Sequence, residues 1–185
     1  MPRTARFVIP DISVHVVQRG HNRNGCFFQE IDYLAYLDDL QAFAARFHCS
    51  VHAYCLMTNH VHLLITPHTA DACAQLMKNV GQRHVQRINA RLQRTGSLWE
   101  GRFYSCPVPS ERYALACYRY IELNPVGAGM VRHPDEYRWS SYRVNAQGRS
   151  HGFVTPIPRI SRWAAIGRRA LTHMSASSTV RSSNL

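Results

Sequence analysis

The sequence predicts a mixed α+β fold, because strand patterns and helix patterns follow one another along the chain. Segments that are rich in β-branched residues or have alternating side chains predict strands over 12–18, 50–57 and 60–66. Apolar residues that recur every three or four positions predict long helices over 32–47 and 70–94.

The length and the charge limit the classes of function. A chain of 185 residues can bury one ordinary core, so we expect one domain over 1–148 and an extension over 149–185. The chain has 22 Lys and Arg against 11 Asp and Glu, a formal charge of +11, and Lys78 is its only lysine. The planar guanidinium suits bidentate contacts with phosphates and guanine edges, so nucleic acid is the leading partner class. The alternative is a basic protein whose arginine content reflects genome composition.

Cysteine usage and hydropathy predict a cytoplasmic protein. The six cysteines form no Cys-x-x-Cys pair, so we interpret them as small buried hydrophobes in a reducing compartment. The first residues lack the apolar core of a signal peptide, and no apolar run reaches the ~18 residues of a membrane span.

The first strand ends in a polar loop, 19–25, that contains two arginines, two asparagines and two glycines. This composition suits base-edge hydrogen bonds and close approach of the backbone, with a plain connection as the alternative. The helix that follows begins with Asp32 as its expected cap, and Leu34, Leu37 and Leu40 are expected on its apolar face.

The next two strands are joined by the tight turn Thr58-Asn59 and form a hairpin that carries His60 and His62. Side chains alternate along a strand, so the two imidazoles lie on one face about 7 Å apart and can converge on one ion. Val61, Leu63 and Ile65 are then expected on the other, buried face. From the spacing alone, two ordinary histidines on a strand are an equal alternative.

The long helix places Arg83 and Arg87 on one side, where they form either a phosphate-tracking stripe or a solvated charged face. A loop with Trp99 follows, and we expect this ring to cover the edge of the core rather than to stack on a base. The chain then enters a short strand through Arg102, Phe103 and Tyr104 that ends near Val108.

A third helix is expected from the cap Ser110 to Pro125, since proline cannot continue a helix interior. Tyr120 and Asn124 lie one turn apart on its polar side, whereas Tyr118 is expected in the core. Tyr113 shares the face of Tyr120. We expect Glu122, in the apolar sector, to pair with an arginine. After about Gly148 the pattern weakens, with a short helix expected around 161–171 and a disordered serine-rich tail after His173.

These pieces together indicate metal-assisted phosphoryl transfer with a tyrosine nucleophile. A divalent ion between two imidazoles can offset the charge that develops on a scissile phosphate. A neutral phenol has a pKa of about 10 and attacks poorly unless it is positioned in line with the phosphorus.

Three ordered blocks resemble the IS200-like single-tyrosine (Y1, HUH) transposases, and most closely the REP-associated tyrosine transposase branch. The blocks are Leu56-Met57-Thr58-Asn59-His60-Val61-His62-Leu63-Leu64, Leu98-Trp99-Glu100-Gly101-Arg102-Phe103, and Tyr118-Arg119-Tyr120-Ile121-Glu122-Leu123-Asn124-Pro125. The resemblance covers roughly Phe7 to Tyr142 and implies a ferredoxin-like (RRM-like) antiparallel sheet with helices packed on it and the histidine strand central.

The resemblance also implies the chemistry. Tyr120 is the implied nucleophile, which attacks single-stranded DNA beside a hairpin and forms a 5′-phosphotyrosine and a free 3′-hydroxyl. His60, His62 and Asn124 are the implied ligands of Mg²⁺ or Mn²⁺, and no nucleotide cofactor is implied. The candidates for DNA contacts are Arg19, Asn22, Arg23, Arg83, Arg87 and Arg102. We expect a monomer, with a dimer as the alternative.

Other functions remain open at this point. A domesticated module that binds hairpin DNA without cutting it would keep the arginines and tolerate loss of the tyrosine or the ligands, all of which are present. A metal-dependent hydrolase needs a carboxylate base near the histidines, which the sequence does not reveal. An RNA-binding domain is allowed by the sheet, but its aromatic glycine-rich strand signature is missing. Tyr113 and Tyr118 stay rival nucleophiles if the helix register differs.

Overall fold

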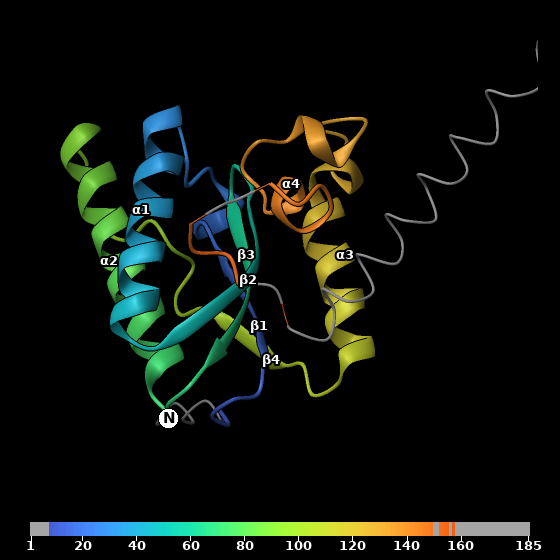
Figure 1. The fold of residues 1–185 in the computed structure, drawn as a ribbon. Coiled ribbons are helices and arrows are strands. Elements are labelled where there is room, and N and C mark those ends of the chain that lie inside the picture. Colours follow the sequence, from blue (N-terminus) through green and yellow to red (C-terminus); the bar gives the residue numbers. More distant parts are fainter. Residues whose placement is uncertain (1–7, 150–151, 156, 158–185) are drawn as a thin grey trace, which may run out of the picture. The chain divides into compact units, whose positions relative to one another are not determined.

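Four antiparallel strands form one sheet in the order β2-β3-β1-β4. The computed structural model describes residues 8–149, 152–155 and 157 (Figure 1). Contacts divide the chain into Met1–Thr155 and Pro156–Leu185, and the description below concerns the first unit. The helix expected around 161–171 and the serine-rich tail lie outside the described residues.

The elements follow in the order strand, helix, strand, strand, helix, strand, with further helices after the sheet is complete. The strands are β1 (Val14–Arg19), β2 (Cys49–Leu56), β3 (His60–Pro67) and β4 (Tyr104–Pro107). The helices are α1 (Glu30–Arg46), α2 (Ala72–Arg91), α3 (Glu111–Gly127) and α4 (Tyr142–Asn145), with short 3₁₀ turns at His21–Arg23 and Pro134–Glu136. This order and the sheet topology confirm the ferredoxin-like α+β fold, and β3 is central as predicted.

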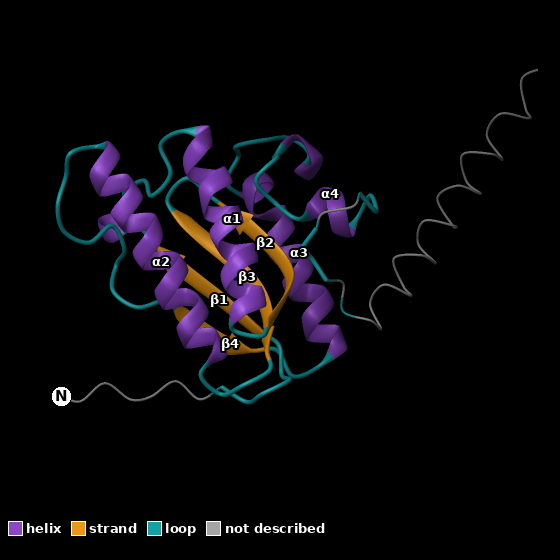
Figure 2. Ribbon diagram, turned by 60° about the vertical axis from the view of Figure 1, so that its left-hand side comes forward, coloured by secondary structure: helices purple, strands orange, loops and turns teal. Residues whose placement is uncertain are grey.

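The sheet separates two layers of helices, α1 and α2 on one face and α3 on the other (Figures 1 and 2). Val14 and Val16 of β1 are buried with Val61, Leu63 and Ile65 of β3 in the core beneath α1 and α2. Because side chains alternate along a strand, the histidines of β3 lie on the opposite face, toward α3. The predicted placement of the histidines opposite the apolar core face is therefore confirmed, but the histidine face is not open, because His62 and Leu64 are buried as well.

The predicted start and apolar face of α1 were partly wrong. Gln29 is the N-cap, and Asp32 is the third helical residue of a capping box, where its Oδ2 accepts hydrogen bonds from Phe28 N and Gln29 N, each at 2.9 Å. Leu34 is 41% exposed, whereas Tyr36 is fully buried. Leu37 and Leu40 are buried as predicted, and Tyr33 and Tyr36 take the place of Leu34 on the buried face.

The helix α3 continues through Pro125 to Gly127, so its predicted end was wrong. A proline this close to the end removes one backbone hydrogen bond without displacing a following turn, which explains why the helix tolerates it. Tyr118 is buried, as predicted, with Ile121 on the same side. Glu122 is also buried, but the partners of its carboxylate among the described residues are Ser141 and Asn145, each at 2.8 Å, and not an arginine.

Other expectations depended on burial. Trp99 is 5% exposed and its Nε1 donates to the Gly81 carbonyl oxygen at 3.2 Å, so it covers the core edge as expected. Four cysteines are buried, whereas Cys106 is exposed and Cys117 is intermediate.

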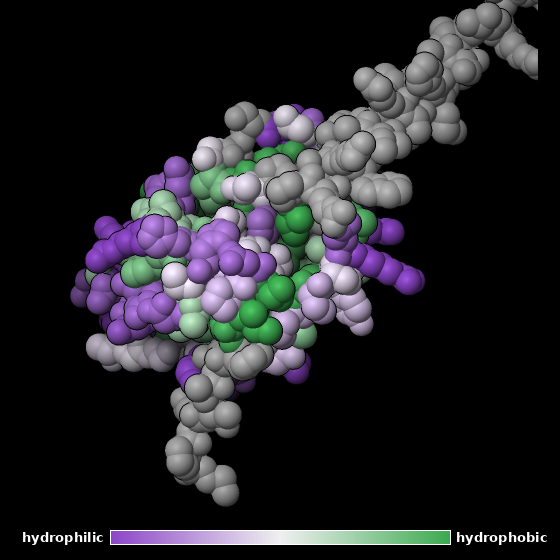
Figure 3. Space-filling view, turned by 60° about the horizontal axis from the view of Figure 1, so that its bottom comes forward, coloured by the Kyte–Doolittle hydropathy of each residue, from purple (hydrophilic) through white to green (hydrophobic). Residues whose placement is uncertain are grey.

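Within the described part of the chain, no helix is long and apolar enough to cross a membrane. Hydrophilic residues dominate the outer side of α1 and α2 (Figure 3).

Candidate active site

Three histidines and one tyrosine meet on the α3 face of the sheet. His60 and His62 come from β3, His15 from the neighbouring strand β1, and Tyr120 from α3. The ring centroids of His60 and His62 are 4.8 Å apart, and those of His15 and His62 are 5.2 Å apart with nearly parallel planes. Tyr120 meets His62 edge-on at 5.4 Å and His15 at 5.8 Å. The structure thus brings together residues that are more than one hundred positions apart.

His60 lies at the start of β3, next to the turn. Its Nδ1 lies 2.6 Å from Asn59 Oδ1, and its imidazole shares a hydrogen bond with the side chain of Asn124. Burial lowers the pKa of His60, the nearby charge of Arg19 lowers it further, and the bond with Asn124 opposes both effects. His60 and Asn124, two of the ligands that the resemblance implied, are therefore neighbours.

His62 is 3% exposed and is held by a single polar contact. Its Nδ1 lies 3.0 Å from Nε2 of His15, while its buried Nε2 has no hydrogen-bond partner among the described residues. Burial lowers the pKa of His62 to about 3, and the neighbouring His60, His15 and Arg19 add to this effect. The imidazole is therefore neutral at physiological pH, which is the form that binds metal.

The geometry fits a divalent ion at this position. A buried nitrogen without a partner is costly unless a ligand occupies its lone pair, and His62 Nε2 is such a nitrogen. If Nδ1–H of His62 donates to His15, Nε2 keeps the free lone pair that metal ligation requires. The described residues contain no group of three or more His, Cys, Asp and Glu that could hold a metal, so an ion here would depend on two imidazoles and an amide oxygen.

The tyrosines of α3 occupy three different environments. Ser110 caps the helix by accepting from Tyr113 N, and the helix then places Tyr120 over the histidines. Tyr120 is 57% exposed, so a polymeric substrate can reach its hydroxyl. Tyr113 is 67% exposed and lines a groove of about 530 Å³ that also includes His15 and Tyr120. Tyr118 is buried on the other side of the helix.

The polar loop after β1 lies beside the histidine hairpin. Gly20 N donates to the Asn59 carbonyl oxygen at 2.8 Å, and Asn59 Nδ2 donates to the Arg23 carbonyl oxygen at 3.1 Å. Asn22 and Arg23 are exposed, with φ angles of 53° and 60°. Arg19 pairs with His60 across the strands. These three DNA-contact candidates therefore lie at the same end of the sheet as His60.

The other arginine candidates lie elsewhere. Arg83 and Arg87 belong to α2, on the opposite face of the sheet, and both pair with the buried Asp39 of α1 at 3.3 and 2.7 Å. Their side chains remain 58% and 39% exposed. Arg102 is exposed in the segment before β4 and lines a second groove with Gln18.

His15 was not selected by the sequence reasoning. The available signal was the alternation of side chains along the strand. His15 lies between Val14 and Val16, so it must face away from the core that these valines enter. Its proximity to His62 depends on the register of β1 against β3, in which Val17 is opposite His62.

A ferredoxin-like sheet with two histidines on its central strand and a tyrosine helix across that face is the arrangement expected of single-tyrosine DNA transposases. The family model described as "Transposase IS200 like" matches residues 8–124. The chain therefore belongs to the IS200-like transposase family and is a tyrosine transposase.

Comparison with one solved structure supports the fold. The chain is similar to a structure described as "the REP associates tyrosine transposase bound to a REP hairpin", with 16% identity, a TM-score of 0.68, and coverage of 85% of this chain and 96% of that chain. A putative transposase from Deinococcus radiodurans R1 shows 21% identity, a TM-score of 0.45, and coverage of 65% and 96% of the respective chains. The search of curated proteins gave no significant match.

Proposed function

We propose that this transposase is metal-dependent, and that it cleaves and rejoins single-stranded DNA next to REP-like hairpins through a 5′-phosphotyrosine intermediate. One observation carries the proposal. The exposed Tyr120 packs edge-on against His62 at 5.4 Å, and Nε2 of His62 is buried without a partner. An accessible phenol and an unsatisfied, buried imidazole nitrogen thus belong to two rings in contact.

The hairpin substrate is supported by charge and by the relative in complex with a REP hairpin. The formal charge of +11 favours a polyanion, and the loop with Arg19, Asn22 and Arg23 extends from the end of the sheet where His60 lies. We propose this loop as the main DNA contact near the reacting phosphate. Arg83, Arg87 and Arg102 are proposed as outlying contacts with the phosphate backbone.

In the proposed reaction the Tyr120 hydroxyl attacks the phosphorus of one phosphodiester. The bond between phosphorus and the tyrosine oxygen forms as the bond to the 3′-oxygen breaks. The phenolic proton passes to solvent, and the 3′-oxygen takes up a proton from solvent to leave as a 3′-hydroxyl. Attack of a 3′-hydroxyl on the phosphotyrosine reverses these bond changes and rejoins DNA. The energy of the diester is kept in the tyrosine linkage, so no nucleotide cofactor is needed.

His60, His62 and Asn124 are the side chains that we propose hold Mg²⁺ or Mn²⁺. When bound, the ion would offset negative charge on the reacting phosphate. We propose His15 as a positioning residue: its Nε2 lies 3.0 Å from Nδ1 of His62, and with the proton on His62 Nδ1 this hydrogen bond fixes the ring so that Nε2 keeps its lone pair for a metal. The nearly parallel stacking of the two rings limits rotation of His62 in addition.

We propose that the catalytic unit is residues 1–148, that it acts as a monomer in the cytoplasm, and that 149–185 forms an extension. The site supports the monomer, since the described unit alone supplies both histidines and the tyrosine.

The test is to incubate the protein with labelled single-stranded hairpin DNA and Mn²⁺ and to resolve the products on a denaturing gel. We expect a covalent adduct that chelator abolishes and that Tyr120→Phe lacks. Tyr113→Phe is the matched control and should form the adduct, because Tyr113 lies farther along the groove. Tight binding without adduct or cleavage on every hairpin tested would instead favour a domesticated binding module.

A further inference from the structure

An open groove of about 510 Å³ runs along α3 beside Tyr120, apart from the two grooves described above. It is lined by Arg119, Tyr120, Leu123, Asn124, Gly127 and Ala128, all from α3 and its C-cap. These residues define the Arg119 groove. The proposed nucleophile and a proposed metal ligand thus lie in it beside one cation.

A glycine keeps the Arg119 groove open at its far end. A Cβ at Gly127 would meet no atom of the described residues within 4 Å, so the space beside the last turn of α3 is empty. Gly127 follows Leu123 by one helical turn and Tyr120 by two. The low wall at this position lets a bulky polymer approach the helix next to the tyrosine.

The guanidinium of Arg119 is free to bind an anion. Arg119 is exposed, and it has no ion pair or hydrogen bond with any described residue. Arg87 and Arg91 of α2, in contrast, each pair with a buried aspartate, at 2.7 and 2.6 Å. An anion at Arg119 therefore displaces no existing partner.

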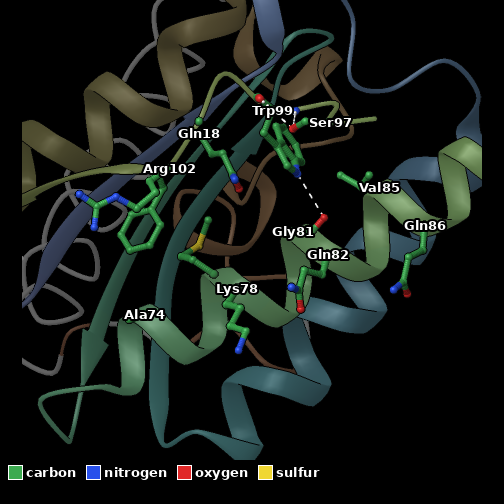
Figure 4. A pocket seen from close by; sticks show the side chains of 13 residues that line it. Gln18, Ala74, Lys78, Gly81, Gln82, Val85, Gln86, Ser97, Trp99 and Arg102 are labelled. Carbon is green, nitrogen blue, oxygen red and sulfur yellow. Dashed lines mark hydrogen bonds between the residues drawn. The ribbon is translucent and has the colours of Figure 1, made fainter. Parts of the chain in front are cut away.

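The other cations of the described chain are placed differently around Tyr120. Lys78 and Arg102 line the groove between α2 and the segment before β4 (Figure 4). Arg19 lies at the end of the sheet, where its charge acts on His60. No Lys or Arg is among the described residues that line the groove with His15. Arg119 is thus the cation on the helix side of the tyrosine.

Electrostatics makes this one cation important. The C-terminal end of a helix carries a partial negative charge, which disfavours a phosphate in a groove that follows α3 to its end. Negative charge on the two nonbridging oxygens must also be offset while a phosphoryl group is transferred. A guanidinium meets both needs, because its planar fork donates two parallel N–H bonds to a phosphate.

We propose that Arg119 is a further catalytic residue, which donates hydrogen bonds to the nonbridging oxygens of the phosphate that Tyr120 attacks. The inference rests on the proposed function and leaves its bond changes as given, since the guanidinium keeps its proton throughout. Neighbouring Cα atoms are about 3.8 Å apart and their side chains project about 100° apart on a helix. Two long side chains with this spacing can meet at one phosphorus from different sides.

The test separates the rate of adduct formation from binding. The probe is a labelled DNA hairpin with single-stranded flanks, recovered from a randomised pool by this protein. The rate is measured in Mn²⁺ with saturating protein, and Kd is measured in chelator. We expect Arg119→Gln to lower the rate about 100-fold, as for loss of one donor to a transition-state oxygen, and to change Kd by less than about threefold. Arg119→Lys should recover part of the rate, because it restores the charge without the fork.

Arg112→Gln is the matched control. Arg112 is exposed on the same side of α3, two turns before Arg119, and lines neither groove beside Tyr120. We expect its rate to stay within about twofold of the original. A rate for Arg119→Gln within about threefold of the original, or an equal loss in Arg112→Gln, would overturn the proposal.

The inference and the proposed function fail in different ways. If the original protein forms no adduct on any hairpin, the proposed cleavage is refuted, and the role of Arg119 with it. If the original protein and Arg119→Gln form the adduct equally fast, only the role of Arg119 is refuted.

Discussion

Replacement of His15 by phenylalanine tests how the histidine site is held together. Phenylalanine keeps an aromatic ring that can stack on His62, but it removes the Nε2 acceptor that lies 3.0 Å from His62 Nδ1. The Nδ1–H is then buried without a partner, at a cost of about 1–3 kcal/mol unless the ring turns away. Either response raises the free energy of the conformation that presents Nε2 to a metal.

The expected effect is on metal affinity before activity. Loss of an outer hydrogen bond to a ligating histidine lowers metal affinity by about 10–100-fold, or roughly 1.4–2.7 kcal/mol. We therefore expect His15→Phe to bind Mn²⁺ at least about tenfold more weakly in calorimetric titration. Adduct formation should need correspondingly more Mn²⁺ but approach the original level when metal is in excess. The affinity for hairpin DNA in chelator should stay within about twofold, since His15 is not among the proposed DNA contacts.

Two controls make the result specific. His15→Gln offers an amide oxygen in place of the imidazole nitrogen, so it should recover part of the Mn²⁺ affinity. His133→Phe removes an exposed histidine that bonds to Asp135 outside the site and should leave the affinity unchanged. A folded His15→Phe protein that binds Mn²⁺ as tightly as the original would refute the positioning role.

Three further predictions concern charge. The pKa of His62 is lowered to about 3, so below about pH 6.5 the unfolded chain binds a proton that the folded chain does not. In chelator, we therefore expect the free energy of unfolding to fall by about 2 kcal/mol between about pH 7.5 and pH 5, relative to His62→Gln. A difference between the two proteins that stays constant with pH in denaturant titrations would contradict this. Burial raises the pKa of Glu122, so its contribution to stability is complete below the pKa of the unfolded state and is lost as pH rises through the pKa of the folded state. We therefore expect the free energy of unfolding of Glu122→Gln to rise relative to the original protein as pH rises. A fall would show that the charged form of Glu122 is the stabilising one. Arg23→Gln should reduce the slope of log Kd against log salt by about 1. Arg83→Gln should reduce this slope by less than about half of that, because Arg83 already pairs with Asp39. Equal reductions in the two variants would show that both arginines contact the DNA equally.

The mixed α+β class and the histidine hairpin could be predicted because both depend on local periodicity, whereas the ferredoxin-like topology followed from the family resemblance. Alternation along β3 puts Val61, Leu63 and Ile65 in the core, and it necessarily puts His60 and His62 on the other face. These relations hold within one strand, so no knowledge of neighbours is needed.

The missed features depend on contacts between distant segments. His15 reaches His62 only through the register of β1 on β3, which a single strand pattern does not encode. Arg83 and Arg87 form a stripe on α2 as predicted from spacing, but the sequence could not indicate that buried Asp39 of α1 would pair with both. A charged helix face looks the same in sequence whether its partner is a carboxylate or a phosphate.

The position of Tyr120, the proposed nucleophile, depends on a segment that follows α3. Glu122, two residues beyond Tyr120, accepts hydrogen bonds from Ser141 and Asn145. Ser141 is in turn tied to β2, because its backbone N donates to the Tyr54 carbonyl oxygen at 2.9 Å and its Oγ accepts from Tyr54 N at 3.0 Å. The helix α3 is therefore fixed to the sheet by a buried polar network close to Tyr120. Because a buried polar group without a partner is costly, such a network favours a single position of the helix on the sheet. Since the proposed in-line attack requires a defined distance between phenol and phosphate, the residues after α3 belong to the proposed catalytic unit as much as the histidines do.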